Sequence, residues 1–265
     1  MNESSRPENA FVEPRPNSPE ALKQRVLNKK INWKWPVLIL FARTLFAFLA
    51  QAIVAAIYAA IGDPSPWQAA APWWTVHGTL IDVGCLLLLL FLVRKEGIRL
   101  IDLISVSRNR IGRDLILGVG IMFLFLAVFV GFGTAIGFII YGTIEIPTPF
   151  GSLPTVALLY SIIVFPIIWG ITEQMTYNGY VFPRLEALSG RAWVAVLVVA
   201  VGWALQHIAL PFQLDVQFSL LRVLPAIPFA IIAILIYAKT RRLLPLIVAH
   251  WGVEVIAIVN AQFLS

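Results

Sequence analysis

Long apolar segments dominate the chain after its first 35 residues. Most are about as long as a helix that crosses the hydrocarbon of a bilayer, which needs about 20 apolar residues. Backbone groups find no water there, so each span should be helical, and the segments alternate too little for barrel strands. The pattern predicts an all-α, polytopic transmembrane helix bundle of about seven spans. In chain order these are Pro36–Ile61, Trp73–Val93, Leu115–Tyr141, Leu153–Thr172, Ala192–Leu210, Val223–Ala238 and Leu243–Leu264.

The composition agrees with a chain whose solvent is lipid. Of its 265 residues, 59% are hydrophobic and only 13% are charged, and the mean hydropathy is +0.84. These values lie outside the range of water-soluble globular domains. Residues 1–35 differ: they are rich in Pro, Asn, Ser, Glu and Arg without periodicity. They are predicted to form a disordered cytosolic tail, followed by the helix bundle over residues 36–265.

The basic residues predict the orientation. All of the 20 Lys and Arg residues except Arg43 and Arg222 fall in the N-terminal segment or in the second, fourth and sixth loops. Basic residues collect on the cytosolic side of membrane proteins, so the N-terminus should lie in the cytosol and the C-terminus outside. The net charge of +6 follows from this asymmetry. It is weak evidence for nucleic acid binding, and we expect none.

Two ionisable residues in the second span need an explanation. Asp82 lies near its middle, where a lone carboxylate is costly, and Arg43 in the first span is the obvious partner. The sequence does not say whether such a pair is structural or functional. His77, nearer the outer end of the span, is expected at the membrane interface.

The second half of the chain holds four residues that hydrocarbon normally excludes: Glu173, His207, His250 and Glu254. His250 and Glu254 are spaced i, i+4 and therefore share one face of the last helix. Two imidazoles and two carboxylates could perform general acid and base catalysis without metal. Alternatively, His207, His250 and Glu254 could bind zinc and leave a position open for water. Either route would give hydrolysis.

The order of these motifs resembles the CPBP family of intramembrane proteases, which includes type II CAAX prenyl endopeptidases and bacteriocin-processing or immunity proteins. That family carries Glu-Glu-x-x-x-Arg, then Phe-x-x-x-His, then His-x-x-x-Asn or Asp on successive helices. The similar segments here are EQMTYNG at 173–179, WALQH at 203–207 and HWGVE at 250–254. The resemblance covers residues 150–260, which would form the catalytic core.

The resemblance implies roles for the polar residues. Glu173 corresponds to the glutamate that activates water, and His207 and His250 would position that water, bind metal or stabilise the oxyanion. Glu254 takes the place of the Asn or Asp, and can donate a hydrogen bond only when protonated. The implied substrate is a membrane-anchored protein or peptide.

Two further positions depart from the family pattern. Gln174 replaces the second glutamate and Asn178 replaces the arginine. At i, i+4 these two amides could form a neutral hydrogen bond in place of an ion pair, which would support the site.

Straight helices would place the catalytic residues at different depths. Glu173 would lie at the cytosolic end of its span and His207 near the outer end of the next. For them to meet, either the helix of Glu173 runs on into residues 179–188, or the fifth segment starts deeper or is re-entrant.

Three functions therefore stay open. The first is an intramembrane endopeptidase in the bacterial cytoplasmic membrane. The second is a catalytically inactive relative that acts as a scaffold or immunity factor. The third is an ion-coupled transporter, although no inverted repeat is visible.

Overall fold

The computed structural model describes residues 14–104, 106–143 and 153–263, and these form helices and connecting turns without strands. Seven helices are long and apolar enough to cross a membrane, as predicted. They are Lys34–Ala60, Pro66–Lys95, Leu100–Tyr141, Thr155–Ser189, Ala192–Ala209, Val216–Thr240 and Leu244–Phe263. Of the predicted boundaries, Leu264 lies outside the described residues.

Several spans consist of shorter helical elements joined end to end. Their bounds, in chain order, are α1 (Pro19–Leu27), α2 (Lys34–Ala60), α3 (Pro66–Ala70), η1 (Ala71–Trp73), α4 (Trp74–Lys95), η2 (Leu100–Leu103), η3 (Arg108–Arg110), α5 (Ile111–Tyr141), α6 (Thr155–Ile163), α7 (Phe165–Gln174), η4 (Met175–Val181), α8 (Phe182–Ser189), α9 (Ala192–Leu205), η5 (Gln206–Ala209), α10 (Val216–Val223), α11 (Ala226–Thr240) and α12 (Leu244–Phe263).

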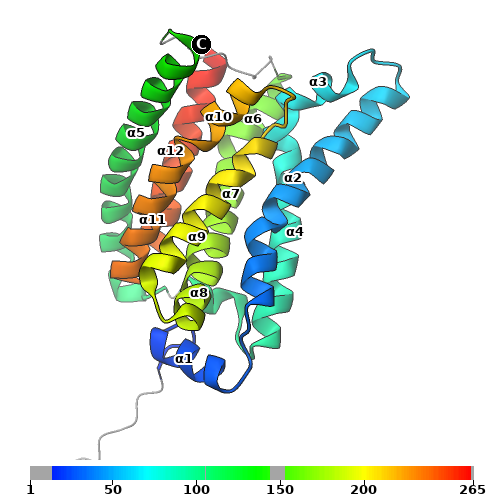
Figure 1. The fold of residues 1–265 in the computed structure, drawn as a ribbon. Helices are drawn as coiled ribbons and strands as arrows, with labels where there is room; N and C mark the ends of the chain where they lie inside the picture. Colours follow the sequence, from blue (N-terminus) through cyan, green and yellow to red (C-terminus); the bar gives the residue numbers. More distant parts are fainter. Residues whose placement is uncertain (1–13, 105, 144–152, 264–265) are drawn as a thin grey trace, which may run out of the picture.

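The long helices run along a common direction, and α1 lies across one end of the bundle (Figure 1). α12 packs against α5 and α7, α2 packs against α4, and α9 packs against α11. Large apolar side chains such as Leu45, Leu87 and Phe123 remain more than half exposed on the outer surface. Such a surface suits contact with lipid chains, and the protein is a multi-pass membrane protein.

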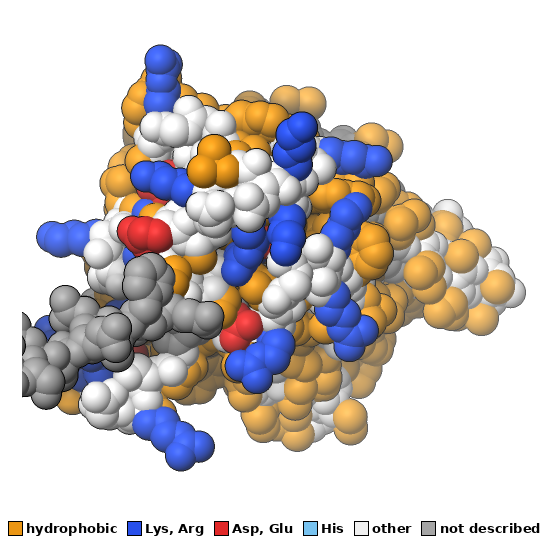
Figure 2. All heavy atoms as spheres, turned by 90° about the horizontal axis from the view of Figure 1, so that it is seen from below, with side chains coloured by type: hydrophobic (Ala, Val, Ile, Leu, Met, Phe, Trp, Pro, Cys, Tyr) orange, Lys and Arg blue, Asp and Glu red, His pale blue; other side chains and the backbone are white. Residues whose placement is uncertain are grey.

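Lys and Arg side chains spread over the end of the bundle where α1 lies, and few acidic side chains accompany them (Figure 2). We call this end the basic end. It is the end that the positive-inside rule assigns to the cytosol.

The N-terminal segment is more ordered than its composition predicts. Residues 14–35 are described and contain helix α1, so the prediction of a disordered tail does not hold for them. The Ser18 hydroxyl accepts a hydrogen bond from the Ala21 N–H, and Pro19 stands at the first turn, where its missing N–H costs nothing. Leu22 is fully buried. One buried leucine and a capped first turn dock α1, which average composition does not reveal.

Asn17, just before α1, connects the N-terminal segment to the helix that carries Glu173. Its Nδ2 donates to the carbonyl of Gly179 at 2.9 Å, and its Oδ1 accepts from Arg184 Nη1 at 3.0 Å. Pro183 has no N–H to donate to the Gly179 carbonyl, four residues earlier in the chain. The Asn17 side chain therefore provides a donor where proline removes one.

Replacing Asn17 by alanine should lower the free energy of unfolding by about 1–3 kcal/mol, because buried polar groups on Gly179 and Arg184 lose a partner. Titration with a denaturing detergent, followed by intrinsic fluorescence, measures this difference. Asn28→Ala is the control, since the Asn28 side chain makes only an exposed hydrogen bond with Gln24. Equal effects of the two substitutions would contradict the docking role of Asn17.

A close approach between α5 and α12 depends on Gly118. A Cβ atom there would lie 2.7 Å from Val248 Cβ and 2.9 Å from the Pro245 carbonyl oxygen. On the same helix, a Cβ atom at Gly120 would meet nothing within 4 Å.

Gly118→Ala should therefore push α5 away from α12 and lower the free energy of unfolding by about 1–3 kcal/mol. Gly120→Ala should be neutral or slightly stabilising, because alanine favours helix more than glycine does. The same denaturation assay compares the two variants. The packing argument fails if Gly118→Ala is tolerated as well as Gly120→Ala.

Candidate functional site

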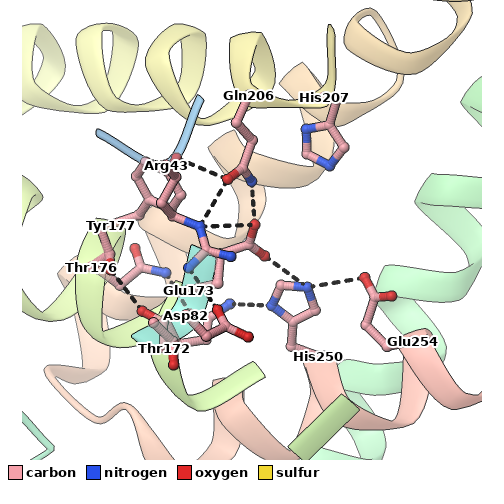
Figure 3. A network of polar contacts seen from close by, with 12 residues as sticks. Arg43, Asp82, Thr172, Glu173, Thr176, Tyr177, Gln206, His207, His250 and Glu254 are labelled. Atoms are coloured by element: carbon pink, nitrogen blue, oxygen red, sulfur yellow. Dashed lines mark hydrogen bonds and ion pairs between the residues drawn. The ribbon is translucent and has the colours of Figure 1, made fainter. Parts of the chain in front are cut away.

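The carboxylate of Glu173 is the centre of a buried polar network (Figure 3). Glu173 belongs to α7, and its side chain is 1% exposed. Its Oε1 accepts a hydrogen bond from Gln206 Nε2, and its Oε2 lies 3.0 Å from His250 Nε2. Residues from α7, η5 and α12 thus meet around one carboxylate.

Gln206 is oriented by two donors. Its Oε1 accepts from Arg43 Nε at 2.9 Å and from the Tyr177 hydroxyl at 3.1 Å. Because the oxygen is used in this way, the amide nitrogen must face Glu173. Gln206 therefore presents a donor to the carboxylate in a fixed direction.

Arg43 and Asp82 form the predicted ion pair, with 2.9 Å between Arg43 Nη1 and Asp82 Oδ1. Both side chains are fully buried. The guanidinium also lies over the ring of Trp169, 4.3 Å from its centroid, and its Nε is 4.0 Å from Glu173 Oε1. The pair from α2 and α4 thus borders the site, which the sequence did not determine.

His250 lies between two carboxylates and an amide. Its Nε2 faces Glu173 and also lies 3.5 Å from Glu254 Oε1, while its Nδ1 lies 3.1 Å from Gln174 Nε2. Gln174 Oε1 in turn accepts from Asn178 Nδ2 at 2.7 Å, so the predicted amide pair is present. The i, i+4 spacing of the last helix does bring His250 and Glu254 together.

His207 is near the network but does not bond to it. Its Nδ1 lies 3.2 Å from the carbonyl oxygen of Ala204, which can only accept, so Nδ1 carries the proton. Nε2 is then free to accept. Glu173 and His207 interact electrostatically, and Figure 3 shows the imidazole on the side of the network where Glu254 lies.

The exposed side of the site is the side of Glu254. The Glu254 side chain is 19% exposed and His207 is half-buried, whereas Gln174 and Asn178 are fully buried. The more accessible side of the site is therefore the side of His207 and Glu254.

Glu173 and His207 do not lie at different depths in the bundle, because the helix of Glu173 continues beyond it. α7 passes through the π-helix η4 into α8, so the fourth span reaches Ser189 at the basic end. With about 1.5 Å per residue, Glu173 lies about 24 Å from Ser189 and His207 lies about 22 Å from Ala192. The short turn between these helices therefore places Glu173 and His207 at the same height. Of the two predicted solutions, the continued helix is the correct one.

A zinc site does not form from the predicted ligands. Within the described residues, no group of three or more His, Cys, Asp or Glu side chains is arranged to hold a metal ion. His250 faces Glu173 and Glu254, but His207 bonds the Ala204 carbonyl and stays apart. His207, His250 and Glu254 in this arrangement do not fit zinc.

The structure adds residues that the sequence reasoning missed or misplaced. Gln206 and Tyr177 contact the network, and a glutamine within an apolar span was the available signal for Gln206. His77, expected at the interface, is 2% exposed because α4 packs against α2 and α7. Arg222 bonds the Leu210 carbonyl oxygen at 2.7 Å, next to the turn that carries Gln206 and His207.

One protein family model matches the part of the chain that carries this geometry. The family model described as "Type II CAAX prenyl endopeptidase Rce1-like" matches residues 155–256, the segment that holds Glu173, His207, His250 and Glu254. Over these residues the chain matches this family model, which supports the resemblance to the CPBP family. The description of the matched family names a protease. No curated protein and no solved structure matched the chain.

The segment that the family model matches contacts the first two spans through Arg43, which is paired with Asp82. Arg43→Met should leave the Asp82 carboxylate buried without a partner and lower the free energy of unfolding by about 3–5 kcal/mol. The double variant Arg43→Met/Asp82→Leu should lose less than the sum of the two single variants, because no charge is left unpaired. A double-mutant cycle in the denaturation assay measures the coupling. Additive losses would show that the two charges do not depend on each other.

Proposed function

We propose that the protein is an intramembrane endopeptidase that hydrolyses a peptide bond of a membrane-associated substrate with water activated by Glu173. The observation that supports this most directly is the carboxylate of Glu173, buried within the family domain and held on both oxygens by donors. A carboxylate held in this way keeps a fixed orientation, and each oxygen retains a lone pair for a water proton.

The reaction can be written with Glu173 as both base and acid. A water molecule gives one proton to the Glu173 carboxylate while its oxygen adds to the carbonyl carbon of the substrate. The tetrahedral intermediate then breaks its carbon–nitrogen bond, and the protonated Glu173 returns the proton to the leaving amine. The products are a carboxylic acid and an amine, and the enzyme ends in its starting state.

The two histidines take complementary roles in this proposal. His207 has a free Nε2 and can accept a hydrogen bond from the attacking water. His250 points Nε2 at Glu173 and Glu254, so it can donate to Glu173 or to the developing oxyanion. Glu254 lies at the exposed edge of the site, and a protonated Glu254 could add a second donor there.

The proposal also covers the surroundings of the reaction. We assign the catalytic core to residues 150–260, of which 150–152 lie outside the described residues, and the substrate is a protein or peptide anchored in the same lipid bilayer. We place the basic end and the N-terminus in the cytosol, the C-terminus outside, and the protein in a bacterial cytoplasmic membrane. No partner nucleic acid is expected.

Cleavage of a panel of quenched, membrane-anchored peptides by the purified protein in detergent tests the function. We expect turnover by the wild type and a loss of kcat of about 10²- to 10⁴-fold in Glu173→Gln, since a carboxamide cannot take the proton. His207→Ala should also lose turnover. These variants should remain folded, as judged by their denaturation profiles.

The matched control is Glu186→Gln, which removes a carboxylate from the same long helix. Glu186 pairs with Arg241, and both side chains are partly exposed, so little stability and no activity should be lost. A folded wild type that cleaves no peptide of the panel would favour the catalytically inactive scaffold. Turnover that survives Glu173→Gln would assign the base to another residue.

A further inference from the structure

We infer that Gln174, anchored by Asn178, holds His250 as the neutral imidazole with its proton on Nε2. His250 is then a hydrogen-bond donor toward Glu173 and Glu254, and it is not a base. The catalytic meaning of this assignment rests on the proposed function, but the assignment itself concerns only the resting protein.

The contact between His250 and Gln174 identifies the ring nitrogen that accepts a hydrogen bond. Gln174 Oε1 is occupied by Asn178 Nδ2 at 2.7 Å, so the amide nitrogen of Gln174 must turn toward His250. That nitrogen lies 3.1 Å from His250 Nδ1 and can only donate. Nδ1 must therefore offer a lone pair, which means that it carries no proton.

The contacts between His250 and the two glutamates independently identify the ring nitrogen that donates. Nε2 lies 3.0 Å from Glu173 Oε2 and 3.5 Å from Glu254 Oε1. The ionised Glu173 carboxylate only accepts hydrogen bonds, so Nε2 must carry a proton to avoid facing it with a lone pair. The two sides of the ring agree on the same tautomer.

The ring of His250 is buried and packs against two aromatic rings. His250 is 3% exposed. Its ring lies against Trp203 and Phe229, with centroid separations of 6.1 and 5.6 Å. The hydrogen bonds therefore decide the tautomer.

The residue type at position 174 matters for this reason. A carboxylate there would accept only, and would require a proton on Nδ1 in addition to the one on Nε2. Glutamine, with its oxygen committed to Asn178, presents a donor instead. The amide pair thus keeps the second proton off His250, and Asn178 is the residue that gives the Gln174 oxygen its hydrogen bond.

Nuclear magnetic resonance of the full protein in detergent, with ¹⁵N-labelled histidine, tests the assignment at pH 7. The chain has only three histidines, and His77→Gln and His207→Gln assign the resonances. We expect a protonated Nε2 and an unprotonated Nδ1 for His250. In Gln174→Glu the Nδ1 resonance should shift to the protonated position, and in Asn178→Ala part of the signal should do so.

The control is Gln24→Glu, which makes the same chemical change in the exposed Gln24–Asn28 pair of α1 at the same i, i+4 spacing. It should leave the His250 resonances unchanged. A wild-type His250 with its proton on Nδ1, or on both nitrogens, would overturn the inference, whether or not Gln174→Glu folds. So would an unshifted Nδ1 in a folded Gln174→Glu variant.

The spectra test the tautomer of His250 and the peptide assay tests the proposed function, so either can be refuted without the other. A wild type with the expected tautomer but without peptidase activity would refute the proposed function and leave the assignment standing. An active enzyme with a different tautomer would do the reverse.

Discussion

A buried carboxylate must receive hydrogen bonds from the protein, since hydrocarbon supplies none. Glu173 is almost fully buried, and donors from two other helices meet both of its oxygens. Gln206 and His250 are in turn oriented by their own partners. The positions of η5, α12 and α2 around α7 are therefore coupled to the need to satisfy one ionisable group.

The site extends beyond the domain that the family comparison matches. The match covers residues 155–256, but Arg43 on α2 orients Gln206, and Asp82 on α4 neutralises Arg43. A guanidinium 4.0 Å from Glu173 also places positive charge beside the carboxylate. The first two spans are consequently part of the electrostatic environment of the candidate site.

The departures from the family pattern stay within a hydrogen-bonded network. Gln174 and Asn178 bond to each other, and Gln174 bonds to His250. No net charge is buried at these two positions, so no ion pair is needed there. Asn178 itself lies in the π-helix η4, a geometry that often occurs at functional sites. The changes at 174 and 178 therefore preserve a connected support for His250.

The sequence alone determined that the chain lies in lipid, that it is helical and that it has seven spans. The reason is that a long apolar segment in a bilayer can form few structures other than a helix. The sequence also singled out Glu173, His250 and Glu254, since ionisable residues in hydrocarbon are rare and two of these share a helix face. It missed α1, whose docking depends on one buried leucine and a few capping contacts. Only the tertiary structure decided the depth of Glu173, the separation of His207 from His250 and the place of Gln206. Those depend on how far a helix continues and on which side chains meet across helices, and helix periodicity carries no information about contacts between distant segments.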